Sequence, residues 1–401
     1  MISFRFFFLA LNIGLTIAIS AMVGRALGQG DRTKARRLSA SGLVHSCVLS
    51  ILVSAIALPW RSELLMLIGA RGEALAAADT FLLITLPSNV LLAAGMSFSG
   101  VLRAVGDAKR AMYVTLFGAV ATAITDPILI FGLGLGVKGA AYATVISRFI
   151  IMATGFWGAV NKHDLVDRPN ARDAWDDVSP LIGIAGPAIL TNLAAPVATS
   201  YMLSVFATFG EPIVAAFAII DRVTPVAFGF LYALSGSVGP IMAQNYGARN
   251  MPRVRRTLSD CFGLTIVYTL AVWVLLFFAA PSINMIFNAH GDTADLVTFF
   301  CHFGAVAWLF LGLIFVANAA FNNLGFPLYS TLFNWGRATL GTIPFVTYGA
   351  IQAGPQGGLM GMIAGAALFG ILAVTTAYWA VRRMTKRVEA AASAESVLGQ
   401  P

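Results

Sequence analysis

The sequence predicts an all-α polytopic membrane protein with two repeated bundles of transmembrane helices, five helices in the first bundle and six in the second. Of its 401 residues, 58% are hydrophobic and only 11% are charged, whereas a soluble globular domain carries roughly 25% charged residues. Long apolar stretches recur along the chain, and Lys and Arg gather between alternate stretches. A soluble fold of this size could not bury so much apolar side chain, so lipid must be the solvent.

Each predicted helix is a stretch of about 20 mostly apolar residues, which is long enough to cross roughly 30 Å of hydrocarbon. The stretch after Met1 also has the composition of a signal peptide, but the internal repeat described below favours a spanning helix. The predicted helices cover residues 4–26, 38–60, 79–102, 111–133, 137–159, 180–206, 213–245, 257–279, 295–320, 328–350 and 358–381.

These helices divide the chain into four segments. Residues 1–159 form the N-terminal bundle and residues 180–381 form the C-terminal six-helix bundle. Residues 160–179 are rich in charged side chains and form a linker, and residues 382–401 form a tail that begins with two arginines.

The charged residues predict the orientation, because cytoplasmic loops of membrane proteins carry an excess of Lys and Arg. The linker, the tail and the alternate loops on their side hold 19 of the 26 Lys and Arg residues, and the opposite side holds four. We therefore expect a multi-pass protein of the bacterial inner membrane with its linker and C-terminus in the cytoplasm. This topology accounts for the net charge of +8 without a nucleic-acid partner.

The two halves of the chain match each other at a nearly constant offset, which indicates an internal duplication of the kind found in transporters. The first two matches have an offset of 219 residues and the third has one of 222. The matched segments are 28–31 with 247–250, 106–107 with 325–326, and 136–139 with 358–361.

The same offset places the partner of helix 180–206 before Met1. The chain is therefore expected to be a six-plus-six protein that lacks its first helix. A start codon assigned too far downstream would explain this, and a true eleven-helix protein is the alternative. The DNA upstream of Met1 would distinguish the two.

Several ordered motifs resemble the multidrug and toxic compound extrusion (MATE) family. They are Gly106-Asp107, Thr125-Asp126-Pro127, the glycine-rich run from Gly132 to Thr144, and Gln244-Asn245-Tyr246-Gly247-Ala248. The resemblance covers nearly the whole chain. It implies two six-helix bundles around a cavity, with secondary active efflux of cationic or amphipathic drugs by cation antiport and alternating access. The expected partners are a small-molecule substrate, membrane lipid and a coupling cation, and we expect a monomer.

Asp126 is the acidic residue that lies well inside a predicted helix with no basic neighbour. Hydrocarbon favours the protonated form of a carboxyl group, so Asp126 could bind and release a proton. Pro127 removes a backbone donor and is expected to kink the helix beside it. A protonated Asp126 that only hydrogen-bonds its neighbours, with a static bend, is the alternative.

The resemblance also implies partners for this coupling site. Similar family members use an Asn one turn before the Asp, a Thr in the next helix and an Asp in the first helix. Thr122 replaces that Asn here, Thr144 matches the Thr, and the first-helix Asp has no counterpart. No Na⁺-binding acid of the second bundle could be matched, which favours H⁺ over Na⁺ as the coupling ion.

Arg337 is the most unusual charge in the second bundle, because it lies about ten residues inside a predicted helix. It could contact a substrate, pair with a carboxylate in gating, or donate to backbone carbonyl groups. No metal-ligand spacing, phosphate-binding loop or nucleophile–base motif is present. The sequence therefore predicts a transporter without a cofactor or metal rather than an enzyme.

Two other functions remain open at this stage. The same architecture could carry another cargo, as a flippase or exporter of lipid-linked saccharides does, although only three basic residues, Arg148, Arg222 and Arg337, lie well inside predicted helices. A truncated membrane protein that transports nothing is the other alternative.

Overall fold

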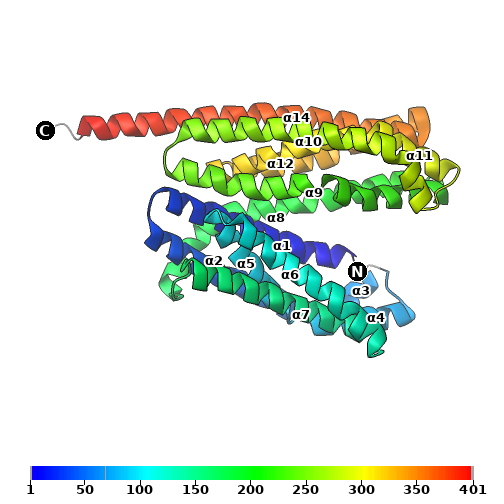
Figure 1. The fold of residues 1–401 in the computed structure, drawn as a ribbon, viewed down its shortest axis with the longest axis horizontal. Helices are drawn as coiled ribbons and strands as arrows, with labels where there is room; N and C mark the ends of the chain where they lie inside the picture. Colours follow the sequence, from blue (N-terminus) through cyan, green and yellow to red (C-terminus); the bar gives the residue numbers. More distant parts are fainter. Residues whose placement is uncertain (1, 68, 399–401) are drawn as a thin grey trace. The chain divides into compact units, whose positions relative to one another are not determined.

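The computed structural model describes residues 2–67 and 69–398. Every regular element in these ranges is a helix, and the chain divides into unit 1, up to Ile189, and unit 2, from Leu190 onward (Figure 1). Nine helices in the described ranges are long and apolar enough to cross a membrane. The predicted all-α polytopic membrane fold is therefore confirmed.

Unit 1 is built around α1, α2 and α5, which pack against one another and bury Leu15, Ile19 and Leu102. The helix α7 packs against α5 and α6. The elements of unit 1 are α1 (Ile2–Gly28), α2 (Arg32–Ala57), α3 (Arg61–Leu67), α4 (Gly72–Thr85), α5 (Asn89–Ala104), α6 (Ala108–Pro127), η1 (Ile128–Gly132), α7 (Gly136–Phe156), η2 (Trp157–Lys162) and the first half of α8 (Ala171–Ala207).

Unit 2 is built around α9, α12 and α14, with Met242, Phe321 and Ala377 fully buried between them. The elements of unit 2 are the second half of α8, α9 (Glu211–Gly247), α10 (Met251–Ile286), α11 (Asp292–His302), η3 (Gly304–Val306), α12 (Ala307–Leu324), α13 (Pro327–Gly336), η4 (Arg337–Gly341) and α14 (Ile343–Leu398).

The predicted spans and the observed helices differ at three places. The predicted helix 295–320 is broken into α11, η3 and α12. The predicted helix 79–102 is two helices, α4 and α5, with a bend of 56° between them. Conversely, the predicted helices 328–350 and 358–381 fall in one continuous helical run, 327–390. A straight helix of that length would extend about 96 Å, roughly three times the hydrocarbon thickness. This run must therefore fold back on itself.

Glycines show where the helical run 327–390 folds back on itself. Ala353 and Gly354 have non-helical backbone angles, and Gly354 has a φ of 60°. On the two sides of this break, a Cβ atom at Gly365 would overlap the Gly341 carbonyl, and one at Gly361 would overlap the Phe345 carbonyl. Such close backbone contact is typical of small residues at membrane helix interfaces. The run is thus a helical hairpin, and it contains both predicted helices.

The internal repeat is visible in the backbone of the described residues. Asp31 and Asn250, which the sequence aligns, both cap a helix by accepting the backbone N–H three residues later, at 2.8 and 3.2 Å. Gly106 and Gly325, also aligned, have φ angles of 89° and 90°. Equivalent loops therefore turn in the same way in both units.

Each unit also contains a broken helix at an equivalent place. The break between α4 and α5 frees the Thr85 carbonyl, which accepts a hydrogen bond from Arg148. The break between α11 and α12 frees the His302 carbonyl, which accepts one from Trp273 at 2.9 Å. The two carbonyls lie 217 positions apart in the sequence, close to the repeat offset.

The hairpin contact leads to a stability prediction. Substituting Gly365→Ala forces the two backbones apart, and we expect it to lower the free energy of unfolding by about 1–3 kcal/mol or more. The control is Gly263→Ala in α10, where an added Cβ meets no atom within 4 Å and helix propensity favours Ala. Thermal unfolding of the purified protein in detergent measures both effects. Equal melting temperatures for the Gly365→Ala variant and the wild type would rule out the close contact.

Candidate functional site

The helix α6 carries the predicted coupling residue, and its register changes just after Pro127. A proline has no N–H to continue the helical ladder. The chain does not end its helix there and instead enters the π-helical segment η1, in which the Leu133 N–H donates to the Ile128 carbonyl at 2.8 Å. Such segments are rare and are often found at functional sites. Asp126 lies immediately before this change of register.

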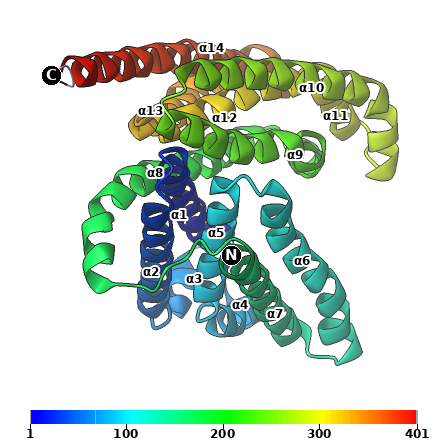
Figure 2. The same ribbon diagram turned by 60° about the vertical axis from the view of Figure 1, so that its left-hand side comes forward.

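The helices α6 and α7 contact each other closely at two levels, and Figure 2 shows them joined by the loop after η1. At one level Ser147 donates to the Gly118 carbonyl at 2.8 Å. At the other, a Cβ on Gly139 would lie 2.6 Å from the Leu129 carbonyl oxygen. Asp126 in α6 and Thr144 in α7 both lie between these levels. Both residues therefore lie on the stretch of the helix pair that these two contacts bound.

The three predicted coupling residues do not hydrogen-bond one another in this structure. Thr122 donates to the Gly118 carbonyl at 3.1 Å, and Thr144 donates to the Ala140 carbonyl at 2.9 Å. Asp126 is half-buried, and no hydrogen-bond or ion-pair partner of its carboxyl group is found among the described residues. An unpaired charge inside a membrane costs about 2.5–3.5 kcal/mol on insertion scales.

The three arginines inside predicted helices have different surroundings. Arg148 donates to the Thr85 carbonyl and, at 2.8 Å, to the Ser88 hydroxyl, so it supports the α4–α5 break. Arg222 is exposed. Arg337 begins η4, and its buried Nε atom has no hydrogen-bond partner within the described ranges. The sequence leaves open that Arg337 donates to backbone carbonyls in unit 2. In unit 1 it is Arg148 that has this role.

Tyr232 of α9 is an aromatic residue whose contacts the sequence did not reveal. Its ring centre lies 5.1 Å from that of Phe315 and 6.2 Å from that of Trp308, both on α12.

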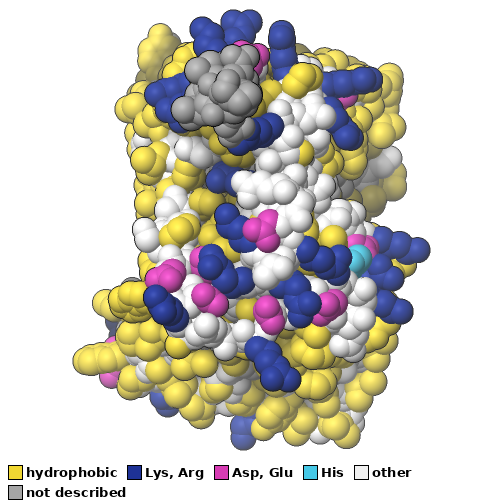
Figure 3. Space-filling model, turned by 90° about the vertical axis from the view of Figure 1, so that its left-hand side faces the viewer, with side chains coloured by type: hydrophobic (Ala, Val, Ile, Leu, Met, Phe, Trp, Pro, Cys, Tyr) yellow, Lys and Arg dark blue, Asp and Glu magenta, His cyan; other side chains and the backbone are white. Residues whose placement is uncertain are grey.

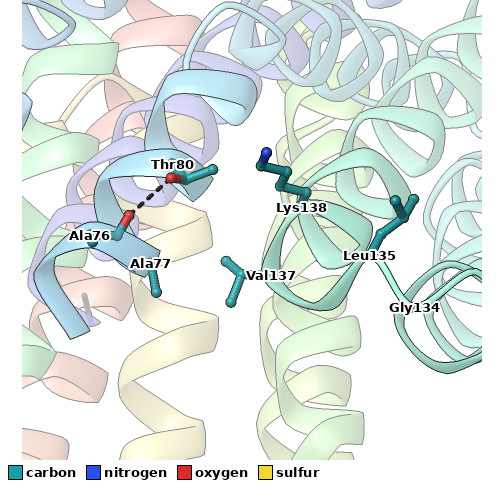
Figure 4. Close-up of a pocket in the computed structure, with 7 residues that line it drawn as sticks. All are labelled: Ala76, Ala77, Thr80, Gly134, Leu135, Val137 and Lys138. Atoms are coloured by element: carbon teal, nitrogen blue, oxygen red, sulfur yellow. Dashed lines mark hydrogen bonds between the residues drawn. The ribbon is translucent and has the colours of Figure 1, made fainter. Parts of the chain in front are cut away.

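An open pocket of about 510 Å³ lies in unit 1 between α4 and the start of α7. Figure 4 shows Lys138 reaching toward the α4 side, where Thr80 donates to the Ala76 carbonyl at 2.9 Å. The lining residues are Ala76, Ala77, Thr80, Gly134, Leu135, Val137 and Lys138. The pocket contains one cation and no acid, and Asp126 is not part of its wall.

A network of charges ties the linker of unit 1 to the ends of its helices. Asp164 pairs with Arg36 at 2.8 Å, and Asp177 pairs with Arg37 at 3.0 Å. Residues 163–170 have no regular structure, and α8 begins at Ala171. Figure 3 shows such charged side chains gathered on one face, with largely hydrophobic sides beside them. The acidic residues of the linker thus neutralise part of the basic loop charge.

Asp107 is the central acceptor in this network. Its Oδ1 accepts the Arg110 backbone N–H at 3.0 Å, and its Oδ2 accepts hydrogen bonds from the His163 ring at 2.8 Å and from the Arg110 guanidinium. Burial by itself would raise the pKa of Asp107. The hydrogen bonds and the positive charge of Arg110 outweigh burial and lower this pKa to about 2.

Comparison with known proteins identifies similar sequences and folds. The MatE family model matches residues 1–128 and 187–347. A protein of Shewanella oneidensis named "FAD transporter" is 26% identical over 390 residues, which is 95% of this chain and 85% of that protein. The "Multidrug export protein MepA" of Staphylococcus haemolyticus is 25% identical, over 82% of this chain and 71% of that protein.

A solved structure shares the fold. It is described as the outward-facing conformation of a multidrug resistance MATE family transporter of the MOP superfamily. It superposes with a TM-score of 0.90 at 22% identity, over 96% of this chain and 87% of that one.

The lowered pKa of Asp107 predicts how stability depends on pH. The ionised carboxylate stabilises the fold above its ordinary pKa of 3.8, and this contribution is lost as the pH falls toward about 2. We expect Asp107→Asn to lower the free energy of unfolding at pH 7 by about 2 kcal/mol.

The difference in the free energy of unfolding between the wild type and Asp107→Asn should shrink as the pH is lowered from about 4 to about 2. Asp260→Asn, at a carboxylate 68% exposed, is the control and should have little effect. Unfolding in detergent at several pH values measures both. A difference for Asp107→Asn that stays constant with pH would contradict the ionic role.

Proposed function

This chain belongs to the MatE family of membrane transporters, and from this premise we propose that it exports amphipathic organic molecules in exchange for protons. Membership makes it a multi-pass membrane transporter. We place it in the bacterial inner membrane, with its linker and C-terminus in the cytoplasm, because the basic loops favour that orientation. We further propose that it works as a monomer.

The proposal that transport is coupled to protons rests on Asp126. Its carboxyl group is half-buried in a helix long and apolar enough to span the membrane, and no cation lies beside it within the described ranges. Binding a proton neutralises such a group and removes the cost of its charge. Losing the proton restores that cost unless water or an ion reaches the site. The protonation state of Asp126 therefore changes which conformation of unit 1 is favoured.

The change of register after Pro127 supplies a way to convert protonation into movement. Before Pro127 the chain is α-helical. After Pro127 each hydrogen bond of the π-helical segment η1 spans five residues, one more than in an α-helix. A segment that already departs from the α-helical ladder can change its register at low cost, because fewer regular hydrogen bonds must break. We propose that α6 bends differently around Pro127 when Asp126 is protonated, and that this bend alternates access to the transport pathway.

A proton fits this site better than a sodium ion does. Sodium needs several oxygen ligands, whereas a proton needs one carboxylate. Thr122 and Thr144 donate their hydroxyl hydrogens to backbone carbonyls, so neither donates a hydrogen bond to the Asp126 carboxylate. Among the described residues no cluster of three or more His, Cys, Asp or Glu could hold a metal ion.

Two classes of molecule are candidates for the cargo. Amphipathic drugs, including cationic ones, are supported by the similarity to the multidrug export protein of Staphylococcus haemolyticus. A flavin nucleotide is the second candidate. It is favoured by the similarity, over nearly the whole chain, to the protein of Shewanella oneidensis named for FAD transport.

The proton-coupling role is tested by Asp126→Asn, which keeps the shape of the side chain and removes its titration. We expect this variant to fold normally and to lose export driven by a pH gradient, down to the level of empty vesicles. Proteoliposomes with an imposed pH gradient and a fluorescent cargo such as ethidium measure it. Asp260→Asn, at an exposed acid of α10, is the matched control and should transport normally. Drug resistance at the wild-type level in cells carrying Asp126→Asn would contradict the proton-coupling role of Asp126.

A further inference from the structure

Three aromatic rings lie together where the helical hairpin of unit 2 begins and ends. Phe326 and Tyr329 lie at its start, and Trp379 lies near the end of the predicted helix 358–381. The three ring centres are 5.8, 5.9 and 6.0 Å apart. The Arg383 guanidinium lies over two of the rings, 5.2 Å from the centre of Trp379 and 5.8 Å from that of Phe326. We call these four residues the hairpin-end cluster.

An open pocket of about 500 Å³ adjoins the hairpin-end cluster, and two of the cluster's rings form part of its wall. This wall reaches the outside of unit 2, because Leu332 and Trp379 are 61% and 43% exposed. The lining residues are Tyr329, Leu332, Phe333, Thr375, Thr376 and Trp379. The pocket therefore offers aromatic and aliphatic surface next to an arginine, at the point where a membrane hairpin leaves the hydrocarbon.

The internal repeat supplies a matched reference for this cluster. Three residues of unit 1 align with its three rings at offsets of 219, 219 and 222 residues, and they are Asp107, Arg110 and Trp157. In unit 1 the Arg110 guanidinium lies 5.9 Å from the Trp157 ring centre and pairs with the Asp107 carboxylate. The cluster in unit 2 keeps the tryptophan and a cation over it, but the Phe326 ring replaces the carboxylate. Arg383 is exposed, and no ion pair joins it to an acid among the described residues.

The replaced carboxylate indicates which ligand fits the hairpin-end cluster. Arginine binds phosphate oxygens through paired hydrogen bonds, and aromatic rings at the edge of a membrane protein lie at the level of the lipid headgroups. The tail adds exposed positive charge at Arg382, Lys386 and Arg387, and such basic clusters beside a membrane helix attract anionic lipids. We propose that this cluster binds an anionic phospholipid, with the phosphate on Arg383 and an acyl chain in the pocket. The phosphate takes the place that the Asp107 carboxylate fills in unit 1.

Two lipids with the same acyl chains test the role of the phosphate, because phosphatidylglycerol carries one and diacylglycerol does not. Brominated acyl chains quench tryptophan fluorescence on contact, so the purified full-length protein in detergent is titrated with each brominated lipid. A Trp379→Phe variant identifies the share of the signal that comes from Trp379, one of seven tryptophans. We expect the wild type to bind phosphatidylglycerol about tenfold more tightly than diacylglycerol.

Three variants assign this preference to the cluster. Arg383→Gln should weaken phosphatidylglycerol binding about tenfold and leave diacylglycerol binding unchanged. Arg382→Gln is the matched control, because it removes the same charge at the neighbouring exposed position, and it should weaken binding about twofold at most. Leu332→Asn, at an exposed position of the pocket wall, should weaken both lipids, because it removes apolar surface and no charge.

Three outcomes would overturn the lipid site. Equal binding of the two lipids by the wild type, or equal losses in Arg383→Gln and Arg382→Gln, would show that the rings only mark the membrane interface. Inorganic phosphate that displaces phosphatidylglycerol at the concentration of the lipid itself would show that the acyl chain adds nothing. None of these measurements involves the cargo or the coupling ion, so the lipid site and the proposed transport function can fail separately.

Discussion

A backbone carbonyl that leaves its helix inside hydrocarbon must find a donor within the protein, because lipid offers none. Both broken helices of this chain obey that constraint. Arg148 satisfies the carbonyl of Thr85 in unit 1, and the indole of Trp273 satisfies that of His302 in unit 2. The duplicated halves therefore keep one backbone geometry while using different side chains to support it. The side chain at such a position can therefore differ between the halves, provided that it still donates a hydrogen bond to the carbonyl.

The same constraint separates the intramembrane charges into those that support the backbone and those that do not. Arg148 belongs to the first group. Asp126 and Arg337 belong to the second, and each lies at a π-helical segment, Asp126 two residues before η1 and Arg337 at the start of η4. Each of these two charges thus has no counter-ion among the described residues and lies next to a π-helical segment.

Much of this architecture could be predicted from the sequence. Apolar length and the distribution of Lys and Arg predicted the membrane fold, and the aligned glycine turns predicted a repeat that recurs in the backbone angles of Gly106 and Gly325. The α4–α5 bend was missed, because the stretch from 79 to 102 stays apolar through the break. Asp126 could be singled out as an acid in an apolar helix, although its coupling role stays a prediction. The ring contacts of Tyr232 with Phe315 and Trp308 could not be predicted, since they depend on how α9 packs against α12.

The glycine hairpin has a mechanical consequence. Because its two helices touch backbone to backbone at Gly341 and Gly365, parting them would open a void in a region with no side chains to fill it. A rearrangement that keeps this contact would move the two helices together. Arg337, four residues before Gly341, would move with them.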